Sequence, residues 1–140
     1  MDASSNAATF TIDGAAFDDI AGFYAHLNDV FMRGEDWRLG VSLDALNDML
    51  HGGYGALNGA AHPSIRWLRA DKSRADLGYA ETRQWLIAKL ATPRQFNERM
   101  IRAQLDALDA GTGPTYFDLI LQVFADHPDV ELALFPDSAP

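Results

Sequence analysis

Short apolar segments typical of β-strands alternate along this chain with longer segments in which apolar residues recur at helical spacing. The β-branched and aromatic residues of Ala8–Ile12 predict a strand, and Ser64–Leu68 and Val130–Leu134 are two further predicted strands. Helical segments separate them, and strands joined through helices run parallel. The pattern therefore predicts an α/β fold, with a small three-stranded parallel sheet covered by about five helices.

The helical segments carry recognisable start and stop signals. The first spans Phe17–Phe31, with Gly34 as its expected C-cap, and the second begins at Ser42. A third begins near residue 79 and stops at Thr92-Pro93, where Thr-Pro-Arg-Gln predicts the start of a fourth helix that ends at Gly111. A capping box formed by Thr115 and Asp118 predicts the start of a fifth helix.

The helix from Ser42 is predicted to be short, amphipathic and acidic. Its apolar stripe consists of Leu43, Leu46 and Leu50. Its opposite face carries Asp44, Asn47, Asp48 and His51. Asp44 and Asp48 are four residues apart, and two like charges at this spacing cost a few tenths of a kcal/mol. Either a solvated face tolerates this cost, or the carboxylates are presented to a cationic partner.

The composition favours one folded domain in a reducing compartment. The chain has 140 residues, 48% of them hydrophobic, and no cysteine, which excludes disulfides and thiolate metal sites. The acidic N-terminal residues do not resemble a signal peptide, and no apolar run approaches the ~20 residues of a membrane span. We expect a cytoplasmic protein with no membrane partner and one domain at 8–135, between disordered tails at 1–7 and 136–140.

The formal charge of −9 is unevenly distributed along the chain. Residues 1–50 hold nine acids and two bases, residues 66–102 hold nine bases and four acids, and residues 103–140 hold seven acids and no base. An acidic protein is a poor direct partner for nucleic acid, because phosphates repel it. The acidic surface either aids solubility or attracts a basic protein partner.

The residue patterns of several common enzyme sites are missing. The histidines, His26, His51, His62 and His127, are too widely spaced for a helical zinc motif. The chain has no Gly-x-Ser-x-Gly elbow, and the glycines after His51 lack the lysine of a phosphate-binding loop. Asp48 and His51, three residues apart, leave a small hydrolase as a minor alternative. We predict no metal, no cofactor and no enzymatic activity.

The segment Gly40–Leu50 resembles the barstar family of intracellular ribonuclease inhibitors. The second helix of that family carries the pattern Gly-x-x-Leu-Asp-Ala-Leu-x-Asp-x-Leu, which reads Gly-Val-Ser-Leu-Asp-Ala-Leu-Asn-Asp-Met-Leu here. The stretch Leu121–Asp126 and the strand after it resemble the last helix and strand of the family. The resemblance covers residues 8–68 and 115–135, whereas residues 69–114 form an extra helical segment found only in longer relatives.

The resemblance implies a fold and a partner. The fold is a three-stranded parallel sheet packed with helices, and the partner is a basic ribonuclease whose active-site cleft receives the second helix and the loop before it. Asp48 matches the principal cation-binding aspartate of the family, with Asp44 beside it, and Asp126 stands where the family has a contacting glutamate. The other residues expected at this interface are Leu39, Gly40, Val41, Asn47 and His51.

The chain also departs from the family pattern near the expected interface. Arg38 and Leu39 stand where the family has tyrosines, and Asn47 replaces a tryptophan. An arginine that faces a basic cleft is repulsive. The sequence therefore leaves a second possibility open, in which the same scaffold binds a basic protein that is not a nuclease, as a regulator or immunity factor. Trp37 is either a core anchor or an interface residue.

Overall fold

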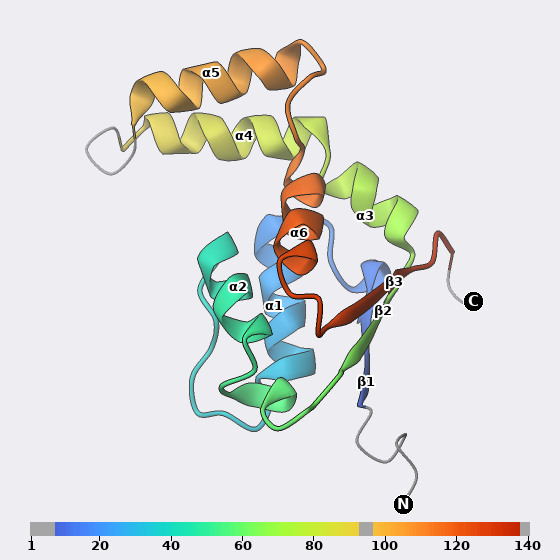
Figure 1. Cartoon of the computed structure of the whole chain (residues 1–140). Coiled ribbons are helices and arrows are strands. Elements are labelled where there is room, and N and C mark those ends of the chain that lie inside the picture. Colours follow the sequence, from blue (N-terminus) through green and yellow to red (C-terminus); the bar gives the residue numbers. More distant parts are fainter. Residues whose placement is uncertain (1–7, 93–96, 138–140) are drawn as a thin grey trace, which may run out of the picture.

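The computed structural model describes residues 8–92 and 97–137 and confirms the predicted α/β fold (Figure 1). Its sheet consists of β1 (Thr9–Asp13), β2 (Ser64–Leu68) and β3 (Glu131–Leu134). The strands are parallel and lie in the order β1-β2-β3, with Ile12 paired with Trp67 and Trp67 with Leu134. Each strand begins within one residue of its predicted start.

Six α-helices and two short 3-10 turns accompany the sheet in the described ranges. The helices are α1 (Ile20–Phe31), α2 (Leu43–Leu50), α3 (Ala70–Asp76), α4 (Tyr79–Leu90), α5 (Glu98–Asp109) and α6 (Tyr116–Ala125). The 3-10 turns are Gly14–Ala16 and Gly55–Leu57. The sequence did not predict α3, which has no side-chain cap and follows Arg69 in a left-handed conformation with φ of 53°. No helix in the described ranges has the length and apolar character needed to cross a membrane.

Several predicted boundaries shift for local reasons. Helix α1 begins at Ile20 and not at Phe17, because the Asp19 carboxylate caps it by accepting from the backbone N–H of Gly22. It ends at Phe31, before the expected C-cap Gly34. Met32 is the C-cap, and its N–H donates to the Asn28 carbonyl.

The predicted helix start at Thr92-Pro93 and the predicted tails fall partly outside the described residues. The described part of α5 begins at Glu98, where the Asn97 side chain accepts from the Met100 N–H. Residues 93–96, 1–7 and 138–140 are not described. In the described part of the segment from residue 136, the Asp137 carbonyl accepts a hydrogen bond of 2.7 Å from the Arg69 N–H.

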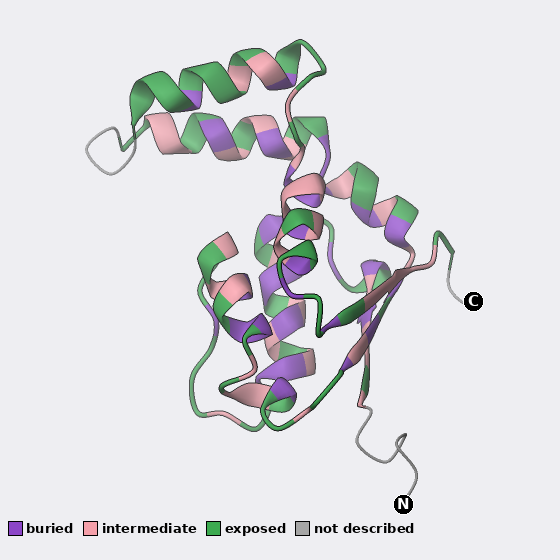
Figure 2. Cartoon of the chain, viewed as in Figure 1, coloured by how far each residue is buried: buried purple, intermediate pink, exposed green. Residues whose placement is uncertain are grey.

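The main core lies between one face of the sheet and helices α1 and α6. At its centre Trp67 stacks on Phe23 of α1, with ring centroids 5.5 Å apart, and meets Phe117 of α6 edge-on at 5.3 Å. The buried indole N–H of Trp67 donates to the Ser73 hydroxyl. Figure 2 shows the buried residues concentrated where these helices face the sheet. The rigid core fixes the positions from which α2 and the loops around it project.

Helices α4 and α5 form a hairpin that stands away from the sheet (Figure 1). It has a small core of its own, in which Leu86 of α4 packs with Ile101 and Leu108 of α5. Trp85 contacts both this core and the main one, and its ring meets Tyr116 of α6 edge-on at 4.8 Å. The hairpin thus packs against α6, and the Glu81 carboxylate of α4 also accepts from the Ile20 N–H of α1.

Candidate functional site

Helix α2 presents two carboxylates to solvent from a well-anchored backbone. The Ser42 hydroxyl accepts a hydrogen bond of 3.0 Å from the Ala45 N–H, as expected of an N-cap. The buried side consists of Leu46, Met49 and Leu50, whereas Leu43 is only half-buried. Asp44 and Asp48 are both exposed and lie one helical turn apart, as the sequence predicted.

The flank of α2 is tied to the loop that follows α6. Nε2 of His127 lies 2.7 Å from Oδ1 of Asn47, and the His51 ring meets the His127 ring edge-on at 4.7 Å. Burial and the neighbouring His51 lower the pKa of His127, against the opposing charge of Asp126. Asn47 is half-buried and is held by its hydrogen bond to His127, whereas Asp44 and Asp48 are exposed.

Asp126 reaches the same region from the far end of the sequence. It is the exposed C-cap of α6, and it lines a cavity of about 300 Å³ together with His51 at the end of α2. The fold therefore brings Asp126 to the C-terminal end of α2. Asp44 lies in the first turn, towards the opposite end of the helix.

The loop before α2 differs from its predicted role at one position. Leu39, expected at the edge of the interface, is a core residue with 6% of its surface exposed. Its backbone N–H donates to Oδ1 of Asn28 at 2.7 Å, which holds the loop against α1. Gly40 and Val41 are exposed beside α2, as the interface prediction requires. Periodicity could not place Leu39 correctly, because an isolated leucine in a loop has no repeating pattern to follow.

Arg38 is folded back onto its own loop. Its guanidinium nitrogen donates to the carbonyl oxygens of Met32, Glu35 and Trp37, at 3.3, 3.1 and 3.1 Å. Through these bonds the Arg38 side chain stabilises the turn between α1 and α2. The side chain predicted to oppose a basic partner therefore also has a structural role in the turn.

An aromatic pair that the sequence analysis did not assemble lies in the same region. Trp37 and Tyr54 have ring centroids 4.6 Å apart, and 43% of the Trp37 surface is exposed. Burial, and then the negative charge of Asp48, raise the pKa of Tyr54. The backbone N–H of Gly55 donates to Oε2 of Glu35 and ties the two loops together. The sequence analysis left Trp37 as either a core anchor or an interface residue and did not single out Tyr54.

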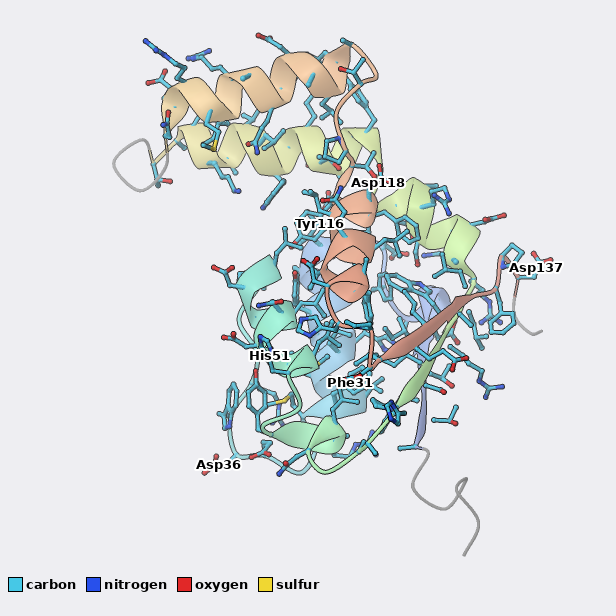
Figure 3. All side chains as sticks on the ribbon, in the orientation of Figure 1. Phe31, Asp36, His51, Tyr116, Asp118 and Asp137 are labelled. Carbon is cyan, nitrogen blue, oxygen red and sulfur yellow. The ribbon has the colours of Figure 1, made fainter. Side chains whose placement is uncertain are left out.

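The surface formed by Trp37, Val41, Asp44, Asp48 and Tyr54 is called the acidic face below. In Figure 3, Asp36 lies at the outer edge of the loop before α2, and His51 marks the other end of the helix. Carboxylates on a rigid helix beside an exposed aromatic ring suit the binding of arginine or lysine side chains. In the described ranges, no group of three or more potential metal ligands is close enough to hold a metal ion.

Comparisons of the chain with protein-family models, with curated proteins and with solved structures found no match.

Proposed function

We propose that this protein is a cytoplasmic barstar-like inhibitor that binds a basic ribonuclease and covers its active site with the acidic face. The observation that carries the proposal is the pair of exposed carboxylates, Asp44 and Asp48, one turn apart on the capped helix α2 beside Trp37. A ribonuclease that holds a phosphate backbone needs cations in its cleft, and two carboxylates at fixed spacing occupy the places of two phosphates.

Rigidity of the acidic face supports tight binding. Three sets of hydrogen bonds hold α2 and its preceding loop in one arrangement. They are the Ser42 cap, the bond between Asn47 and His127, and the bonds from Arg38 to the loop carbonyls. Less conformational entropy is therefore lost when the carboxylates meet their cations. Asp48 is the central anion of the proposal, with Asp44 and Asp126 on either side of it.

The partner in this proposal is basic because the inhibitor is strongly acidic. A formal charge of −9 accelerates association with a positively charged protein, and salt weakens this attraction. The exposed Trp37 supplies an aromatic surface on which a guanidinium group can stack. A basic protein that is not a nuclease is the second candidate, and the α4–α5 hairpin, which the small inhibitors lack, is the feature that favours it.

Isothermal titration against a panel of small basic ribonucleases, with RNA cleavage measured in parallel, tests the proposal. We expect one or more of them to bind with loss of cleavage, and added salt to weaken the binding. Asp48→Ala should cost about 3 kcal/mol or more, because cations of the partner would be left buried and unpaired.

Asp71→Ala is the matched control. Asp71 is an exposed aspartate in the first turn of α3, which Figure 1 shows on the other side of α6 from α2. This substitution removes the same charge from the protein and should leave the affinity within about 0.5 kcal/mol. Equal affinities for Asp48→Ala and the parent would refute the site. Binding to a basic protein without ribonuclease activity would favour the second candidate.

A further inference from the structure

The α4–α5 hairpin and helix α2 form the two walls of a groove, and the proposed function does not use the hairpin wall. The groove has a volume of about 590 Å³, and α6 forms its floor with Tyr116 and Leu119. Val41 and Asp44 line it from the α2 side, and Trp85 and Ala88 line it from α4. An adjoining cavity of about 260 Å³ shares Trp85 and Leu119 with the groove and is lined mainly by α4 and α5.

The walls of the groove are fixed relative to each other. The Thr82 hydroxyl of α4 accepts a hydrogen bond of 2.7 Å from the Tyr116 N–H at the start of α6. The same hydroxyl donates to the Gly78 carbonyl at 2.6 Å, and Trp85 packs edge-on against Tyr116. On the α2 side, Asn47 is bonded to His127 after α6. Both walls are therefore anchored to α6, and the groove is formed before any partner arrives.

Apolar and charged groups are arranged unevenly in the groove. Val41 at its α2 edge and Met100 in the adjoining cavity are 59% and 58% exposed. The Lys89 ammonium lies 3.8 Å from the centre of the Trp85 ring and makes the α4 wall positive. Asp44 makes the opposite wall negative. A cation entering with an apolar group is therefore directed towards α2.

We propose that this groove receives an apolar side chain of the basic protein that α2 binds, with an adjacent cationic side chain of that protein paired with Asp44. The inference rests on the proposed function, because Val41 and Asp44 belong both to the acidic face and to the groove. The hairpin then forms a second contact surface. It selects among basic partners by the shape of the apolar side chain next to the cationic one. Selection of this kind comes from apolar fit, whereas the carboxylates supply the attraction.

One substitution that fills the groove and one that fills the adjoining cavity, compared with a third that does neither, test the inference in the full chain. Ala88→Trp places a ring in the groove from α4, and Ala103→Trp fills the adjoining cavity from α5. Ala80→Trp adds the same ring to an exposed position of α4 that does not line the groove or the adjoining cavity. Titration against the ribonuclease found in the panel should show about tenfold or greater weakening for the first two variants and less than about twofold for the third.

The outcomes separate this inference from the proposed function. Weakening by Asp48→Ala together with unchanged affinity of Ala88→Trp and Ala103→Trp would overturn the groove and leave the proposed function standing. Failure of every ribonuclease to bind would overturn both. Hydrogen exchange of the complex gives a second measurement, in which amides of α4 and α5 should be protected together with those of α2. Protection confined to α2 and the loop before it would also overturn the groove.

Discussion

Nε2 of His127 lies 2.7 Å from Oδ1 of Asn47, so that a hydrogen bond joins the loop after α6 to the middle of α2. An amide oxygen only accepts, and Nε2 therefore carries the proton. The bond holds the helix at a residue that lies between the two exposed carboxylates in the sequence. It also explains why Asn47 serves this fold, since a larger apolar residue could not accept from the imidazole.

Asn47→Ala is predicted to destabilise the protein by about 1 kcal/mol, because the buried imidazole N–H loses its acceptor. Alanine is a better helix former by a few tenths of a kcal/mol, so that the observed loss is a lower limit for the bond. Urea unfolding followed by circular dichroism measures the change. Asn58→Ala, at an exposed position, should have little effect. Equal stabilities of Asn47→Ala and the parent would show that the contact does not hold α2.

Stability is predicted to fall as the pH drops below the ordinary histidine value of 6.5, because burial lowers the pKa of both His26 and His127. Nε2 of His26 accepts a hydrogen bond of 2.9 Å from the Asp13 N–H and must be unprotonated there. A group with a lowered pKa in the folded state binds its proton more readily in the unfolded state, so acid favours unfolding. The free energy of unfolding, measured from about pH 8 to about pH 5, should decrease over this range.

His26→Gln separates this contribution from that of other titrating groups. Glutamine keeps an acceptor but does not titrate, so the variant should lose less stability than the parent between the two ends of the range. His62→Gln is the control, since His62 is exposed. A parallel decrease in the parent and His26→Gln would show that His26 does not contribute.

The sequence was informative where the local pattern alone decides the structure. The Ser42 and Thr115 caps lie where the hydroxyl side chains predicted them, and each strand begins within one residue of its predicted start. These features depend on residues within one turn or one strand of each other. The alternating helices and strands then suffice to predict a parallel sheet.

The parts of the candidate site that escaped prediction depend on contacts between distant residues. Leu39 is fixed by Asn28, and Trp37 by Tyr54 from beyond α2. Arg38 bonds to backbone carbonyl oxygens, which every residue has, so that the sequence does not indicate which of them it contacts. The carboxylates of α2 were predictable because exposed residues of an amphipathic helix follow from its period, whereas loop residues do not.

The buried hydroxyls of Tyr24 and Tyr116 are predicted to be energetically coupled, because they lie 2.7 Å apart and bond each other. Burial raises the pKa of Tyr116 to about 12, so that its hydroxyl stays protonated well into the alkaline range. Either single substitution to Phe leaves one buried hydroxyl without this partner and should cost about 1 to 2 kcal/mol. The double variant should cost less than the sum, with a coupling of about 1 kcal/mol in urea unfolding. Additive losses would indicate that the pair contributes no net free energy.

Arg38→Gln is predicted to change both rate constants of complex formation with the ribonuclease. Loss of the positive charge should raise the association rate by about twofold to fivefold at low salt, because one repulsive interaction is removed. Loss of the hydrogen bonds to Met32, Glu35 and Trp37 should raise the dissociation rate, because the loop before α2 is less ordered. Surface plasmon resonance at two salt concentrations separates these effects. Arg33→Gln, at an exposed position, provides a charge-matched control.

Trp37→Ala is predicted to weaken binding of the ribonuclease by about 2 kcal/mol while changing the free energy of unfolding by less than about 0.5 kcal/mol. The physical reason is that Trp37 packs on Tyr54 with 43% of its surface exposed, so that its ring is available to a partner and adds little to the core. Ile87→Ala is the control, since Ile87 is equally exposed, at 43%, but lies on the hairpin and does not line the groove. Titration gives the affinities, and urea unfolding gives the stabilities. A large loss of stability with unchanged affinity would make Trp37 a structural residue and remove it from the acidic face.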